Sequence, residues 1–436
     1  MKSLRGKSKK AIPPVSALLP GETITFKDED ERHSVSDEEI NSRYVKGDMR
    51  IVTESARYSL AGILSMLEEK VESGDGSEPE YRYKLDPEYQ RRHRWNDVRK
   101  SRLIESFLMN VPVPPVFLYE RDLARFEVMD GRQRLTAIRR FYSNEFKLTG
   151  LQHWPELNGR TYAQLPSKVR DGIDRRYISA IILLKETARD EEQASQLKKI
   201  VFERLNSGGV ALSAQETRNA VFEGPLSRLC LELARNPQFC AMWRLPVSTE
   251  SIPELPEDDD ATEGDGSTDE GRQIFERMDD VELVLRFFAY RQIEGFPGGL
   301  NKIAAFLDRF LSQGNKHFTE PILDAYRTMF TDTIDFLHAV FGADAFCRLE
   351  ATGKTNNSRP AKILYDPLML VASHYVQRGE HQAFMKRPEV LRAALGTMYQ
   401  AHEKSLRGRS TNTAQVRERN KLMAEAFRSA LGKLRG

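Results

Sequence analysis

The feature that most constrains the fold is a change in hydrophobic periodicity along the chain. The first half mixes helical stripes with strand-like runs, and we expect strands over 81–85, 116–119, 126–129 and 178–184. After Phe222 the period-two pattern is lost, and a long helical stripe runs from Ile322 to Phe341. The sequence therefore predicts an α+β N-terminal domain followed by an all-α domain.

Finer patterns divide these regions. In the first half, helices are expected near 60–67, 103–108, 135–141 and 191–205, and a capping box from Ser213 to Glu216 starts another. In the second half they are expected at 361–377, 388–403 and 413–432. We expect three regions: a flexible charged tail (1–50), an α+β domain (51–223) and a helical domain (224–436). Residues 254–270 hold nine acidic residues and no basic one, which predicts a mobile acidic loop.

Composition excludes several classes of protein. Lys plus Arg minus Asp plus Glu gives 66 − 64 = +2, so any basic binding site must be local. The three cysteines form no C-x-x-C pair, and no apolar run reaches the roughly 18 residues of a membrane helix. We therefore expect a cytoplasmic protein that does not bind a membrane. A Gly353-Lys-Thr355 segment imitates a phosphate-binding P-loop, but Arg348 stands where that motif needs glycine.

The segment with the clearest chemistry runs from Val128 to Arg140. An apolar strand ends at Asp130, Gly131 makes a turn, and an amphipathic helix begins at once. Such a turn presents backbone amides and the positive end of a helix dipole, and glycine allows a ligand to approach closely. Arginine binds phosphate oxygens through paired hydrogen bonds, so the arginines at 132 and 134 favour a phosphate site, with those at 139 and 140 extending the charge. The alternative is that Asp130 only caps the helix and the arginines form a solvated face.

Two further clusters accompany this turn. A basic stretch with one aromatic residue runs from Gln90 through Arg91 to Trp95, in a loop before a helix. Its alternative interpretation is that Trp95 packs into the core. The third cluster runs from Phe202 to Gly209 and contains Glu203 and Asn206; its alternative is an ordinary helix end.

Taken in this order and spacing, the three clusters resemble the N-terminal domain of GmrSD-type, modification-dependent restriction systems, a phage-defence family related to the ParB/sulfiredoxin superfold. The matching residues cover about 58–223; they are Gln90, Arg91 and Trp95, then Asp130, Gly131, Gln133 and Arg134, then Phe202, Glu203, Asn206, Gly208, Gly209, Leu212, Ser213 and Glu216. Two positions depart from the pattern: Arg132 replaces a glutamine and His93 replaces a tyrosine. No cysteine lies in 130–134, which excludes the reductase chemistry of sulfiredoxins.

The resemblance implies a ParB/sulfiredoxin-like domain that binds nucleoside triphosphates and hydrolyses them, coupled to DNA. On this interpretation Asp130 would hold Mg²⁺ or a water, while Gly131, Arg132, Gln133 and Arg134 would hold the phosphates. Gln90 and Arg91 would close the site from another loop. Glu203 is the candidate general base and Asn206 an orienting group.

Two functions stay open at this point. The chain is either a nucleotide-dependent switch that acts with DNA or a partner nuclease, or a non-catalytic DNA-binding module of ParB-like fold. An HNH nuclease needs a histidine base close to metal-binding Asn or His residues. The histidines after residue 300 have no such neighbours in the sequence, so we expect no nuclease in this chain.

Overall fold

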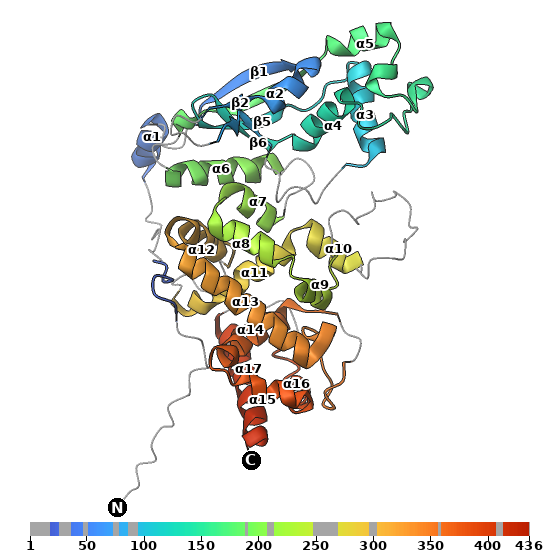
Figure 1. The fold of residues 1–436 in the computed structure, drawn as a ribbon. Helices are drawn as coiled ribbons and strands as arrows, with labels where there is room; N and C mark the ends of the chain where they lie inside the picture. Colours follow the sequence, from blue (N-terminus) through green and yellow to red (C-terminus); the bar gives the residue numbers. More distant parts are fainter. Residues whose placement is uncertain are drawn as a thin grey trace, which may run out of the picture. The chain divides into compact units, whose positions relative to one another are not determined.

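A computed structural model describes residues 18–25, 36–46, 51–72, 78–85, 95–187, 191–206, 213–246, 269–295, 303–355, 359–406 and 413–435. They form two compact units (Figure 1). We call 36–221 the N-terminal unit and 18–25 with 222–435 the helical unit. The chain passes from the first to the second between Val221 and Phe222.

The N-terminal unit is a mixed α+β domain. Its elements are α1 (Asp37–Lys46), β1 (Thr53–Ser59), α2 (Ile63–Glu68), β2 (Lys70–Val71), β3 (Glu80–Tyr81), β4 (Tyr83–Lys84), α3 (Asp97–Leu108), β5 (Val116–Asp122), β6 (Arg125–Asp130), α4 (Arg132–Tyr142), α5 (Ser167–Asp174), β7 (Tyr177–Leu183), α6 (Glu191–Asn206) and α7 (Ala214–Val221).

The main sheet has five strands in the order β1-β7-β5-β6-β4. β1 and β7 pair antiparallel, as do β5 and β6, whereas β5 pairs with β7 and β4 with β6 in parallel. The expected strand over 81–85 is in fact divided, because β3 leaves the main sheet to pair with β2. The apolar pattern gives no sign of β1, since most of its residues are exposed and only Ala56 and Tyr58 pack against the core.

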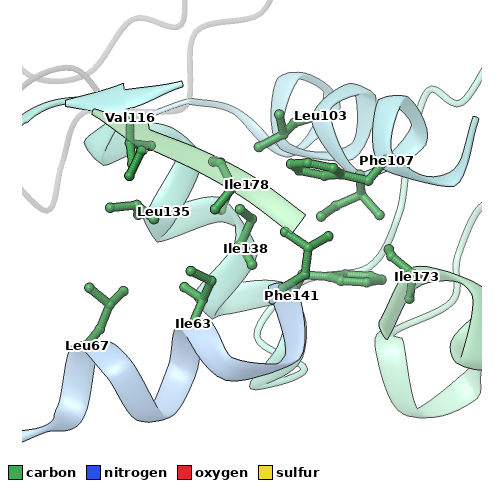
Figure 2. Packing of buried hydrophobic residues seen from close by; sticks show 14 of the residues in the cluster. Ile63, Leu67, Leu103, Phe107, Val116, Leu135, Ile138, Phe141, Ile173 and Ile178 are labelled. Atoms are coloured by element: carbon green, nitrogen blue, oxygen red, sulfur yellow. The ribbon is translucent and has the colours of Figure 1, made fainter. Parts of the chain in front are cut away.

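One face of this sheet carries the core. Val116 and Leu118 of β5, Val128 of β6 and Ile178 of β7 are buried against helices α2, α3 and α4. Figure 2 shows Leu135, Ile138 and Phe141 of α4 in the middle of this cluster, with Val116 beside the first turn of the helix. Burying an aliphatic or aromatic side chain contributes about 1.5–3 kcal/mol, so this packing fixes where α4 begins.

The opposite face of the sheet carries α6. Side chains alternate along a strand, so Glu127 points away from the core that Val128 enters. The Lys198 ammonium of α6 donates to both carboxylate oxygens of Glu127, at 2.8 and 2.7 Å. Figure 1 shows α6 running along the sheet. The helix that carries the third cluster is therefore attached to β6, the strand that carries Asp130.

The helical unit confirms the expected change to all-α structure. Its helices are α8 (Pro225–Leu233), α9 (Pro237–Trp243), α10 (Asp269–Glu276), α11 (Asp279–Ala289), α12 (Ile303–His317), α13 (Glu320–Phe341), α14 (Lys362–Gln377), α15 (His381–Lys386), α16 (Pro388–Ala401) and α17 (Thr413–Arg435). In the described residues after Phe222, β structure is limited to one bridge between Leu349 and Thr355. That bridge closes a turn at Gly353-Lys-Thr355, as expected of a polar loop rather than a P-loop.

The flexible tail expected over 1–50 is corrected at two places. Residues 37–46 form the helix α1. Glu22 is fully buried in the helical unit. The Arg291 guanidinium donates to both oxygens of Glu22, at 2.6 and 3.0 Å, and the Tyr326 hydroxyl donates at 2.9 Å. Burial and the Glu22 carboxylate together raise the pKa of Tyr326.

The described residues bear on two further expectations, the mobile acidic loop and the absence of a membrane helix, only in part. The acidic loop expected over 254–270 lies outside them, except for Asp269 and Glu270, which begin α10. In the part of the chain that the structure describes, no helix combines the length and the apolar character needed to cross a bilayer.

Candidate functional site at the β6–α4 turn

Gly131 makes the turn between β6 and α4, as the sequence predicts. Its φ of +89° lies in the left-handed region, and it is the N-cap residue of α4 without a capping side chain among the described residues. A Cβ built on Gly131 would lie 2.4 Å from Cγ1 of Val116. The space at this position is thus filled by the protein itself. Both the packing and the positive φ therefore require glycine at this position. A ligand cannot occupy the space of the missing Cβ, so it would have to approach the backbone N–H groups at the start of α4.

Asp130 and Arg134 meet across this turn. The Arg134 Nη2 atom donates to Oδ2 of Asp130 at 2.7 Å, and its Nη1 donates to the Pro114 carbonyl at 3.1 Å. The Arg134 side chain is 12% exposed and that of Asp130 52% exposed. The alternative in which Asp130 only caps α4 is therefore wrong, because its carboxylate pairs with a guanidinium and Gly131 holds the N-cap position.

Gln133 connects the turn to the second cluster. Its Oε1 accepts a 3.4 Å hydrogen bond from the Trp95 backbone amide. Trp95 packs partly against the core, and the guanidinium carbon of Arg99 lies 4.9 Å from its ring centroid. The core-packing interpretation of Trp95 is thus supported, and the contact places the start of α3 beside the start of α4.

Arg139 and Arg140 do not extend the charge of the turn. Both lie in the last turn of α4 and pair with Glu145, at 3.5 and 3.0 Å. At about 1.5 Å per residue they begin roughly 11 Å along the helix axis from Arg132. Their charge belongs to the C-terminal end of the helix, where cations are favoured by the dipole.

The remaining predicted residues are only partly described. Gln90 and Arg91 lie outside the described residues. Glu203 and Asn206 lie in the last two turns of α6, and the structure describes their backbone but not their side chains. The capping box after them is confirmed: the Ser213 amide donates to Glu216 at 2.7 Å, and the Glu216 amide donates to the Ser213 hydroxyl at 3.1 Å.

Three residues near the turn were not singled out by the sequence. Pro114 accepts from Arg134, and a run of three prolines before β5 is the signal that could have drawn attention to it. The other two are Glu127 and Lys198. Periodicity alone cannot pair two charges that lie 71 residues apart. Burial and the nearby Glu127 carboxylate raise the pKa of Tyr119, which lies next to this pair.

The turn fits magnesium only as a partner of a phosphate ligand. Among the described residues, no group of three or more His, Cys, Asp or Glu could hold a metal ion. Mg²⁺ commonly binds one or two carboxylates together with substrate phosphates and waters. A half-exposed carboxylate at Asp130, beside a helix N-terminus, suits that arrangement.

Fold and site together define the class: a mixed α+β domain with a strand–glycine–helix turn, continued by an all-α region. The comparison with protein families then names the first part. Residues 73–223 match the model of the GmrSD restriction endonuclease N-terminal domain, which supports the family resemblance of this part of the chain. The match spans about a third of the 436 residues. No curated protein and no solved structure matches the chain.

Proposed function

We propose that the N-terminal unit is a nucleoside-triphosphate-binding switch of a restriction or phage-defence system, with a ParB/sulfiredoxin-like fold. The observation that carries the proposal is the left-handed Gly131 between a strand and a basic helix, within a segment that matches a restriction endonuclease domain. Such a turn directs backbone N–H groups and a helix dipole at one point, which favours an anion.

The residues divide into roles by their place at the turn. Backbone amides at the start of α4, with Arg132 and Gln133, would face the phosphates. Asp130 would hold Mg²⁺ or orient a water, and bound Mg²⁺ would supply charge neutralisation at the phosphate oxygens. Gln90 and Arg91, which lie between β4 and α3 in the sequence, would complete the site. Glu203 would act as general base and Asn206 as an orienting group, from the end of α6.

Nucleotide binding is tested by a thermal-shift panel of ATP, GTP, CTP and UTP with and without magnesium. A ligand at 100 times its dissociation constant stabilises the folded state by about 2.7 kcal/mol. We expect one or more nucleotides to raise the unfolding temperature with magnesium. In Arg132→Met, an affinity about tenfold weaker should reduce this stabilisation to about 1.4 kcal/mol, about half the wild-type effect. Arg140→Met, at the other end of α4, is the matched control. If no nucleotide at millimolar concentration changes the unfolding temperature, the proposal is wrong.

The second candidate is a non-catalytic DNA-binding module. Arg99 at the start of α3, with its guanidinium over the Trp95 ring, favours it, because basic side chains can contact the phosphate backbone of DNA. Such a module would bind DNA with a steep dependence on salt and no response to nucleotide. Measuring DNA affinity at two salt concentrations, each with and without nucleotide, separates the two candidates. In either case we expect no nuclease in this chain: the nuclease is either a partner protein or lost.

A further inference from the structure

The contacts of Arg134 differ from those of an arginine held ready for phosphate. Its Nη2 donates to Asp130 and its Nη1 donates to the Pro114 carbonyl. The side chain is 12% exposed, so most of it is already covered by protein. Each terminal nitrogen carries two N–H hydrogens, and these bonds use one on each nitrogen. A phosphate that displaced both bonds would leave a carbonyl and a carboxylate without their donor, which is costly.

The same side chain packs on the turn itself. A Cβ at Gly131 would lie 3.0 Å from Nη2 of Arg134 and 2.4 Å from Cγ1 of Val116. The glycine is thus held between the β5 side chain and the guanidinium. Arg134 belongs to the first turn of α4, Asp130 ends β6, and Pro114 precedes β5. One guanidinium therefore joins the three segments that define the geometry of the turn.

We propose that Arg134 is a positioning residue: it fixes Asp130 and the first-turn amides of α4 against the Pro114 segment, while Arg132 is the arginine that contacts phosphate. This inference rests on the proposed nucleotide function. This positioning role requires arginine in particular. The planar guanidinium of arginine donates to two separate acceptors at once, whereas the ammonium of lysine is a single point of charge.

The test combines two measurements on the full chain. Hydrogen exchange of the nucleotide-free protein reports whether the amides of 113–118 and 131–136 are protected. Calorimetric titration with magnesium and the best nucleotide of the thermal-shift panel reports affinity. The variants are Arg134→Met, Arg134→Lys and Arg132→Met, and Arg139→Met is the control on the same helix.

For Arg134→Met and Arg134→Lys we expect faster exchange of both segments before any nucleotide is added, and affinity about tenfold weaker, the effect of losing about 1.4 kcal/mol. Arg132→Met should weaken affinity by a similar factor while the exchange of both segments stays at the wild-type rate. Arg139→Met should change neither measurement, since Arg139 lies in the last turn of α4 and its partner Glu145 follows the end of that helix.

Three results would overturn the inference. Weaker affinity in Arg134→Met with unchanged exchange would make Arg134 a direct phosphate ligand. Faster exchange with unchanged affinity would make it a structural residue only, and full affinity in Arg134→Lys would show that charge alone suffices. If the wild-type protein binds no nucleotide, the proposed function fails; exchange in Arg134→Met then still decides whether this residue holds the turn.

Discussion

The buried pair of Lys198 and Glu127 offers a quantitative test of how α6 is held to the sheet. Both side chains are 10% exposed, and the ammonium donates to both carboxylate oxygens. Replacing Lys198 by Met keeps most of the side-chain volume but leaves the Glu127 carboxylate buried without its cation. Breaking a buried ion pair by removing one partner costs about 3–5 kcal/mol. Because Glu127 keeps some access to water, we expect about 3 kcal/mol for Lys198→Met.

The double variant Lys198→Met/Glu127→Leu separates the loss of a contact from the burial of a lone charge. Replacing both members of a buried pair by apolar residues is often neutral or stabilising. We therefore expect the double variant to recover most of the stability lost in the single one. Lys421→Met is the matched surface control, since Lys421 and Glu425 are each 49% exposed and 3.7 Å apart. Exposed helical pairs of this kind contribute about 0.3–0.5 kcal/mol.

The assay must resolve the two units, because a single unfolding midpoint would average them. Hydrogen exchange with mass spectrometry across a urea series gives a free energy of opening for each segment. Lys198→Met should lower that free energy in β6 and α6 and leave α13 and α14 unchanged. A cost below about 1 kcal/mol in Lys198→Met would refute the reasoning, as would a double variant less stable than the single one.

Three further outcomes are expected. Gly131→Ala combines a positive φ with a 2.4 Å contact on Val116, whereas Gly159→Ala has a similar φ of +82° and no neighbour within 4 Å. Thermal unfolding should show the larger loss of stability for Gly131→Ala, and equal losses would contradict the packing argument. Asp130→Asn should lower phosphate release more than nucleotide affinity, measured by release assay and calorimetry, and the reverse order would remove Asp130 from hydrolysis. Burial, followed by the hydrogen bond to Asp174, raises the pKa of Tyr162 to about 12. Because the unfolded tyrosine ionises first, stability should fall as pH rises from 10 to 12, and pH-dependent urea titration should show a smaller fall in Asp174→Asn.

The sequence by itself determined the element types and the place of the central turn. Helical periodicity predicted α13, α14, α16 and α17, because an apolar stripe with a period of 3.6 residues over that length is buried on one face only when the segment is a helix. Asp130 followed by Gly131 and a basic helix predicted the strand–turn–helix, because only local backbone geometry was needed. The family resemblance from the three clusters was confirmed by the match over 73–223.

Tertiary structure decided the contacts between segments far apart in the chain. The pairing of Lys198 with Glu127, the donation of Arg134 to Pro114 and the burial of Glu22 under Arg291 each join residues that no local pattern relates. The sequence missed β1 for the same reason. Its side chains are mostly exposed, and its antiparallel backbone pairing with β7 holds it in the sheet. Periodicity records which face of an element is apolar, whereas the partner of a charge or of a strand edge is set only when the chain packs.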